Sequence, residues 1–345
     1  MQELGLIGVI LLLGVLLTAL GGSTQRIVRD PETGKSYRVT KNKFLNLDRQ
    51  LTLAKNTSFF AIMAIGATVV IVAGGIDLSV AGIYVLAGLA GAATLHEFGP
   101  EGSWRDAPAW LAVLVPSAAC LVTGLLCGLT NGLGVVALRL HPFIITLGTM
   151  SIFRGLAFVT TKAQSIGQFH PAFVDGFISR RLPVGGNEFI YPVPLCIMLA
   201  VAAWGAFYLA STVTGRKLYA IGGNETAAHY AGLPVARLKA MTYVVAGLTA
   251  AIAAMVNIGY HGSAASGDGS GYELAVIAAA VVGGASLSGG RGTALGAVLG
   301  ALIIAMIADG IVILGLDQNY SQMIIGSVIV LAATIDRWQA TWRKG

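Results

Sequence analysis

Residues 57–95 read TSFFAIMAIGATVVIVAGGIDLSVAGIYVLAGLAGAATL, two apolar runs joined by Gly74-Gly75-Ile76-Asp77-Leu78-Ser79. An α-helix needs about 20 predominantly apolar residues to cross the hydrocarbon core of a bilayer, and each run approaches that length. The stretch therefore predicts two membrane-spanning helices, at 57–74 and 79–95, separated by a break that contains a glycine pair.

Similar apolar runs recur along the chain, and further spans are expected at 4–20, 109–138, 142–160, 190–213, 240–259, 273–287, 293–314 and 320–335. The span at 273–287 is short, which favours a broken or re-entrant helix. We therefore expect an all-α fold, a polytopic transmembrane helix bundle of about ten helices with broken or re-entrant segments. Residues 1–345 are expected to form a single transmembrane domain.

The composition agrees with a membrane protein. Of 345 residues, 55% are hydrophobic, 11% are charged and 46 are glycine, and the mean hydropathy is +0.77. Soluble domains carry about 25% charged residues, so this chain lacks the charge to cover a water-exposed surface. A soluble globule, a disordered tail and a nucleic-acid-binding domain are excluded. The net charge of +6 comes from basic residues in short polar gaps, which we interpret as juxtamembrane anchors to membrane lipid and a hydrated loop.

Several motifs of catalysis and metal binding are absent from the sequence. The chain contains no G-x-x-x-x-G-K-[ST], H-E-x-x-H or G-x-S-x-G motif. Cys120, Cys127 and Cys196 lie inside apolar runs, without the spacing of metal ligands. We therefore expect no catalytic residue, no metal site and no cofactor, and no ATP hydrolysis through a phosphate loop of this chain.

The distribution of Lys and Arg bears on orientation, because cytoplasmic loops carry the excess of these residues. With both chain ends in the cytoplasm, nine Lys and Arg lie inside and twelve outside, eight of the twelve within 21–56. Without that segment the balance is nine inside to four outside, so we place both ends inside. The alternative places 21–56 in the cytoplasm and lets 57–95 make only one full crossing.

Segment 21–56 is expected to be an extra-membrane basic loop. Asp30-Pro31-Glu32-Thr33-Gly34 has the chemistry of a turn and lies between Ile27-Val28 and Tyr37-Arg38-Val39, which favours a small β-hairpin. The loop is either a hydrated spacer or a docking surface for a partner.

The glycine pair recurs in the second half of the chain. Gly74-Gly75-Ile76-Asp77-Leu78-Ser79 and Gly283-Gly284-Ala285-Ser286-Leu287-Ser288 share the pattern GGxxLS. Glycine-interrupted segments in both halves of a transporter indicate a translocation site between helix halves. The alternative is a tight turn between helices that requires small residues.

Ionisable residues in apolar runs are candidates for a substrate pathway. Asp77, Arg154 and Asp309 lie within or at the edges of such runs. A charge at mid-membrane costs at least about 2.5–3.5 kcal/mol, so these side chains face the bundle interior or a cavity. The alternative role is structural, with Asp77 capping the helix that begins near Ser79 and Arg154 pairing or snorkelling.

Amide side chains occur inside the runs as well. Asn131 and Asn257 either hydrogen-bond between helices or contact a ligand. Both interpretations stay open on the sequence alone.

Loop 214–239 contains a short helix with its own start and stop. Asn224 is a good N-cap, Glu225 suits the first turn, and Gly232 and Pro234 end the helix. A loop that only joined two spans would not need such signals, so we expect a cytoplasmic docking element, with an interfacial helix on lipid as the alternative. The residues expected in it are Arg216, Gly223, Asn224, Glu225, Ala227, Ala228, Tyr230 and Gly232.

Motifs spread through the chain resemble a known family. The matching stretches are Gly74–Val80, Asn131-Gly132, His141–Gly148, Arg154-Gly155, Gly215-Arg216, Tyr219–Glu225, Ala231-Gly232, Gly271–Leu274 and Gly283–Gly290, in order across 44–335. Together they resemble the permease subunits of bacterial ABC importers for monosaccharides, the ribose/xylose/galactose type related to branched-chain amino acid permeases.

The resemblance implies ten helices per chain, two permease chains per pore, two separate ATPase subunits and a periplasmic sugar-binding protein, in the bacterial inner membrane. It also implies that the loop matching Gly215–Lys239 carries the helix that meets the ATPase. The matching stretches add residues to the expected substrate pathway, which comprises Asp77, Ser79, Asn131, Phe143, Thr146, Arg154, Asn257, Glu273 and Asp309. Segment 21–43 is longer and more basic than in the family, and Asp309 stands where relatives often carry an amide.

Three functions follow from these features. The first is the pore-forming subunit of an ABC sugar importer, which catalyses no reaction itself. The second is an ion-coupled secondary transporter that uses Asp77 and Asp309 as proton or sodium sites. The third is an uncoupled channel or a membrane scaffold.

Overall fold

The computed structural model describes residues 2–29, 36–185 and 188–342. Ten helices lie at the ten predicted spans, which confirms the all-α membrane bundle. They are α1 (Gln2–Leu20), α2 (Leu47–Val72), α3 (Val80–Glu97), α4 (Ala109–Leu138), α5 (Pro142–Thr161), α7 (Pro192–Ser211), α10 (Val235–His261), α11 (Tyr272–Val282), α12 (Ala294–Ile313) and α13 (Tyr320–Trp342). Eight of these described helices are long and apolar enough to cross a membrane, whereas α11 and the apolar part of α13 are shorter.

The remaining elements are short and lie in the connections. They are β1 (Ser23–Arg29), β2 (Ser36–Asn42), α6 (Pro171–Phe173), the π-helical turn η1 (Val174–Ile178), β3 (Leu182–Gly185), β4 (Glu188–Ile190), α8 (Val213–Gly223) and α9 (Glu225–Tyr230). Strands β1 and β2 pair antiparallel, with Ile27 opposite Arg38 and Val28 opposite Tyr37. The turn residues expected between them, 30–34, lie outside the described residues.

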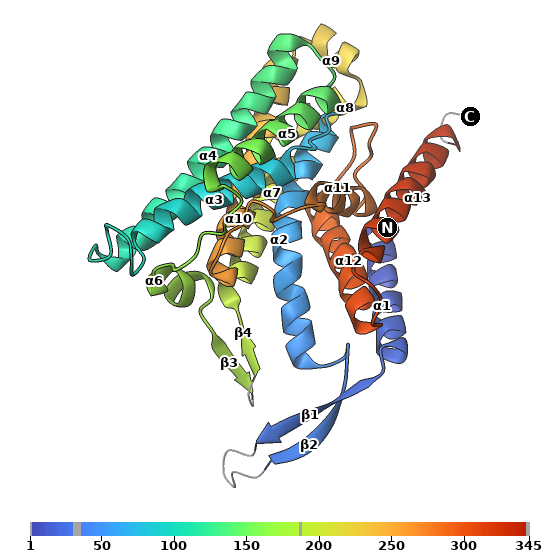
Figure 1. Cartoon of the computed structure of the whole chain (residues 1–345). Coiled ribbons are helices and arrows are strands. Elements are labelled where there is room, and N and C mark those ends of the chain that lie inside the picture. The colour runs from blue at the N-terminus through green and yellow to red at the C-terminus, as the bar shows by residue number, and fades with distance from the viewer. Residues whose placement is uncertain (1, 30–35, 186–187, 343–345) are drawn as a thin grey trace.

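The bundle separates these connections into two ends. In Figure 1 the two β-hairpins, β1–β2 and β3–β4, lie at the lower end, and α8 and α9 lie at the upper end. Helix α1 runs down towards the hairpin end, and α13 runs up from beside the start of α11, so both chain ends point away from the hairpins. Helix α2 ends beside α8, and α3 ends beside Gly167, whose carbonyl contacts the His96 ring. Helices α2 and α3 are each long and apolar enough to cross a membrane, which favours two crossings within 57–95 over the alternative of a single crossing.

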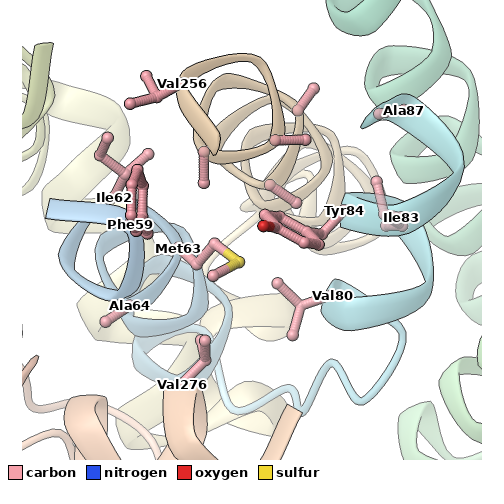
Figure 2. Packing of buried hydrophobic residues seen from close by; sticks show 14 of the residues in the cluster. Phe59, Ile62, Met63, Ala64, Val80, Ile83, Tyr84, Ala87, Val256 and Val276 are labelled. Carbon is pink, nitrogen blue, oxygen red and sulfur yellow. The ribbon is translucent and has the colours of Figure 1, made fainter. Parts of the chain in front are cut away.

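Small residues let the central helices approach closely. A Cβ on Gly124 of α4 would lie 2.4 Å from the carbonyl oxygen of Gly247 of α10, and one on Gly247 would lie 2.2 Å from that of Gly124. Lipid tails are as apolar as helix surfaces, so no hydrophobic driving force brings membrane helices together. Their association depends instead on close van der Waals packing of this kind. Figure 2 shows the adjoining core, where Met63 of α2 and Tyr84 of α3 meet α10 and α11.

Helix α2 begins ten residues before the span expected at 57–74. Asn46 caps it by accepting a 2.9 Å hydrogen bond from the Arg49 amide. The charged side chains of its first turns then find partners in the fold: Arg49 pairs with Asp309, and Lys55 lies 3.4 Å from the centre of the Tyr260 ring. A prediction from hydropathy alone starts the span after these charges, because the residues that pair with them are remote in sequence.

Helix α11 is a half-helix, in agreement with the broken segment expected at 273–287. Gly271, at φ +83°, precedes it in a left-handed conformation that favours glycine. Its first residue, Tyr272, packs on Phe60 at 4.8 Å and on Tyr84 at 5.5 Å between ring centres. Phe60 lies at the middle of α2, so segment 262–271 returns from the end of α10 into the bundle before α11 begins.

Candidate functional site

Loop 214–239 forms two helices. The shorter, α9, begins as the sequence predicts: the Asn224 side chain accepts a 2.9 Å hydrogen bond from the Ala227 amide. It ends at Tyr230, two residues before Gly232, which has a φ of +79°. The longer, α8, was missed because Gly215, Gly222 and Gly223 are poor helix formers. The signal for it was Thr212, which caps α8 by accepting a 2.9 Å hydrogen bond from the Gly215 amide.

Helix α9 presents a polar and aromatic surface. Tyr230 is 84% exposed. Glu225 is exposed as well and forms a 2.6 Å ion pair with Lys239 at the start of α10. Arg216, Gly223 and Asn224 of the expected docking set are exposed as well.

One member of the expected docking set is placed differently. Ala228 is 5% exposed and packs with Leu218, Ile221 and Leu238. The expectation that α9 presents the Ala228 side chain is not met: this side chain anchors α9 onto α8, because only one face of a short helix can point to solvent while the other covers apolar neighbours.

Helix α8 makes a backbone contact with both glycine-rich turns. A Cβ on Gly222 would lie 1.9 Å from the Val72 carbonyl oxygen and 2.5 Å from the Gly290 nitrogen. The Gly290 amide donates a 2.9 Å hydrogen bond to that same Val72 carbonyl. A Cβ on Gly289 would lie 2.6 Å from the Gly222 oxygen. We call Gly222, Gly289, Gly290 and Val72 the glycine joint; it links α8 to the end of α2 and to the loop after α11.

The glycine pairs themselves lie in tight turns at the α8 end. A Cβ on Gly75 would lie 2.7 Å from the Tyr243 hydroxyl, and one on Gly283 would lie 2.2 Å from the Gly296 oxygen. Gly74, the first glycine of one pair, and Gly284, the second glycine of the other, have φ values of +77° and +98°, which glycine adopts without strain. Of the two interpretations of the GGxxLS pattern, this geometry supports the turn that requires small residues.

Four of the predicted pathway residues form one buried network next to the first turn. Asn131 of α4 donates a 2.6 Å hydrogen bond to the Ser79 hydroxyl, which donates a 2.6 Å bond to Asp77. The Ser79 amide also donates to Asp77, at 2.9 Å. Thr146 of α5 contacts the Ile76 carbonyl at 3.4 Å. These contacts tie the 73–79 turn to α4 and α5, which agrees with the structural role considered for Asp77.

Two other predicted residues form an ion pair. Arg154 of α5 lies 3.0 Å from Glu273 in the first turn of α11, and it donates a 3.2 Å hydrogen bond to the Gly269 carbonyl. The pair joins α5 to the start of the half-helix. Phe143, by contrast, is 44% exposed in the first turn of α5, and its backbone carbonyl lies 3.5 Å from the Thr146 hydroxyl.

Asp309 and Asn257, the last two predicted residues, line one cavity. Its volume is about 520 Å³, and its walls come from α2, α10, α11, α12 and α13. Asp309 is 9% exposed, accepts a 2.8 Å hydrogen bond from Arg49 Nε, and pairs with Arg49 Nη2 at 2.5 Å. Asn257 is 8% exposed.

The cavity also contains residues that the sequence did not indicate as functional. Phe60 and Tyr272 form an aromatic pair on one wall, and Asn56 and Gln322 add amide groups. The sequence does place these amides near the ends of apolar runs. Loop residues share that position, so the pattern does not distinguish a functional amide from an ordinary loop residue.

The elements above define a class: a polytopic membrane transport protein with an interior cavity at one end and an exposed helical element at the other. Residues 50–333 match the family described as "Branched-chain amino acid transport system / permease component". The chain belongs to this family of membrane permeases, and it is a multi-pass protein of the bacterial inner membrane. Helix α1 and the β1–β2 hairpin precede the matched residues.

Known relatives are named as sugar permeases. The chain is 36% identical over 297 residues to the ribose import permease protein of Escherichia coli K12, which covers 85% of this chain and 87% of that protein. It is 33% identical to the D-allose transport system permease protein of the same strain, over 85% of each chain. It is 32% identical to the fructose import permease protein of Rhizobium meliloti, over 86% of this chain and 79% of that protein. No solved structure matched the chain.

Proposed function

We propose that the chain is the pore-forming permease subunit of an ATP-driven monosaccharide importer. A separate ATPase docks on the α8–α9 element in the cytoplasm, and a periplasmic binding protein delivers the sugar at the hairpin end. A second permease chain completes the pore. The names of the relatives include ribose, allose and fructose, which supports a monosaccharide as the transported substrate.

The glycine joint is the observation that carries this proposal. An element that merely reconnected α7 to α10 would not need van der Waals contact between backbones at Gly222, Val72 and Gly290. Because side chains are absent there, a push on α8 moves the end of α2 and the loop after α11 without being absorbed by rotamer changes. Nucleotide-driven movement of the ATPase is thereby transmitted to helices that border the cavity.

The alternative of ion coupling receives less support from the geometry. Asp309 is already held by Arg49, and Asp77 already accepts two hydrogen bonds from Ser79. A carboxylate that binds and releases an ion in each cycle would have to break these contacts each time. We therefore assign both carboxylates to positioning their helices.

Uptake by proteoliposomes tests the proposed function. The chain is reconstituted with its ATPase and binding protein, and uptake of radiolabelled ribose, allose and fructose is followed with ATP or with an ion gradient. ATP-dependent uptake that requires both partners is expected, and uptake driven by the gradient alone would refute the proposal.

A coupling variant tests the docking element separately. Glu225→Arg places two like charges beside each other at Lys239 and reverses the charge of an exposed surface, so stimulation of the ATPase by the binding protein should fall. The helices should stay folded, since an exposed ion pair contributes only about 0.2–1 kcal/mol. Unchanged uptake by Glu225→Arg would remove α9 from the docking surface.

A further inference from the structure

The cavity between α2 and α10–α13 has a closed floor and an open mouth. Of the residues that line it, Asn257, Phe59 and Asp309 are buried, whereas His261 and Gln322 are exposed. His261 ends α10, and Gln322 lies in the first turn of α13, beside Gly271 at the start of the half-helix α11. The mouth therefore lies between the end of α10 and the start of α13.

The size and lining suit one small molecule. A volume of about 520 Å³ lies within the range of about 300–1,000 Å³ found for small-molecule sites, which combine apolar and aromatic walls with a few polar groups. Phe60 and Tyr272 supply the aromatic wall, with ring centres 4.8 Å apart and planes inclined by 58°.

Asn257 supplies an unused polar group. Asn257 is 8% exposed as a residue, lines the cavity, and makes no side-chain hydrogen bond with any residue that the structure describes. Its amide oxygen and amide nitrogen are therefore available to accept from and donate to the hydroxyl groups of a ligand. His261 adds an acceptor: its Nδ1 contacts the Asn257 carbonyl at 3.1 Å and must donate there, which leaves Nε2 of the neutral ring free.

Charge selects the ligand class. Within the described residues that line the cavity, Asp309 is the one carboxylate and no Lys or Arg occurs, and the Arg49 guanidinium neutralises Asp309 from outside. An amino acid would require one partner for its carboxylate and another for its ammonium group, and the lining offers neither. Amides that both donate and accept suit hydroxyl groups instead.

We propose that this cavity is a binding station, within a single permease chain, for one neutral polyhydroxylated molecule of monosaccharide size. Asn257 and Asn56 hydrogen-bond its hydroxyl groups, and Phe60 and Tyr272 cover its apolar face. The assignment rests on the proposed importer function and extends it, because it locates the sugar in a cavity of one chain.

Protection from thiol labelling tests the station without the partner proteins. Ser321→Cys places a thiol in the lining, in a Cys196→Ser background because Cys196 is an exposed native thiol. The full chain in nanodiscs is labelled with a maleimide in the presence of D-ribose, D-allose, D-fructose, L-leucine or no ligand. The matched control is Ser327→Cys, an exposed position of the same helix that does not line the cavity.

At least one sugar is expected to slow labelling at Ser321→Cys, with no effect at Ser327→Cys and none from leucine. Adding Asn257→Leu should raise the sugar concentration needed for half-protection by roughly tenfold, the equivalent of one lost hydrogen bond. Absence of protection by all three sugars, or protection by leucine instead, would overturn the station.

A transport arm separates this inference from the proposed function. Ala308→Trp fills the cavity from α12, and Ala206→Trp adds the same volume on an exposed position of α7. In proteoliposomes with ATPase and binding protein, uptake should fall at least tenfold for Ala308→Trp and stay unchanged for Ala206→Trp. If uptake by Ala308→Trp is unchanged, the binding station is wrong and the importer function stands. If sugars protect the thiol but the native chain shows no ATP-dependent uptake, the importer function is wrong and the station stands.

Discussion

Adding one methyl group to the glycine joint should weaken both the fold and the coupling. In Gly222→Ala the new Cβ would lie 1.9 Å from the Val72 carbonyl oxygen, well inside van der Waals contact, so α8 and α2 must move apart. The same movement strains the 2.9 Å hydrogen bond from Gly290 to Val72. Its neighbour Gly223 provides a matched control, because a Cβ there meets nothing within 4 Å.

The magnitude follows from these contacts. Overpacking of a well-packed site costs about 1–3 kcal/mol. Replacement of glycine by alanine in a helix returns up to about 1 kcal/mol, and it does so in both variants. The difference between Gly222→Ala and Gly223→Ala therefore isolates the clash at about 1–3 kcal/mol, roughly 5- to 150-fold in any equilibrium that requires the close contact.

Two measurements on the same preparations check this prediction. Thermal unfolding of the purified chain should show a lower midpoint for Gly222→Ala than for Gly223→Ala. In proteoliposomes with the ATPase and binding protein, sugar uptake per ATP hydrolysed should fall further for Gly222→Ala than for Gly223→Ala. Equal behaviour of the two variants in both assays would refute a transmitting role for the joint.

Three further variants test the buried polar contacts, each by thermal unfolding of the purified chain. Arg49→Met removes the partner of Asp309, which is 9% exposed. The loss of stability should be about 3 kcal/mol or less, since Arg49 is partly exposed. The double variant with Asp309→Asn should recover most of this loss, and a purely additive result would contradict the pairing. Asn131→Ala removes a 2.6 Å donor to a buried hydroxyl and should cost about 1–3 kcal/mol; a neutral effect would show that the network is dispensable. Glu273→Gln should destabilise less than Arg154→Met, because a neutral amide still accepts the 3.0 Å bond whereas loss of the guanidinium frees the carboxylate; the reverse order would contradict the assignment.

Much of the fold could be predicted because its signals are local in sequence. The run over 142–160 is predominantly apolar and begins with a proline suited to a first turn, and α5 spans Pro142–Thr161. The short helix after Asn224 could be predicted for the same reason, since its cap and its terminating glycine are close neighbours along the chain. The start of α2 could not, because Arg49 and Lys55 are tolerated only through partners on other helices.

The candidate site divides in the same way. Sequence reasoning selected Asn257 and Asp309 as polar residues that must face inwards, and both line the cavity. It selected Asp77 and Arg154 by the same argument, yet these face inwards to hold a turn and a half-helix. A charge in lipid is unfavourable, so such a side chain needs a partner. That partner can equally well be a ligand or a group on another helix.

The amino-acid order alone thus establishes a multi-pass bundle of ten helices with a capped helix in one loop, since run length and helix caps depend on residues close together in the chain. The folded chain establishes the rest: Arg49 reaches Asp309 across 260 positions, α8 contacts two distant turns through backbone atoms, and five helices enclose one neutral cavity. The physical reason is that hydropathy and capping are properties of a segment, whereas ion pairing, close backbone approach and cavity shape are properties of segments brought together.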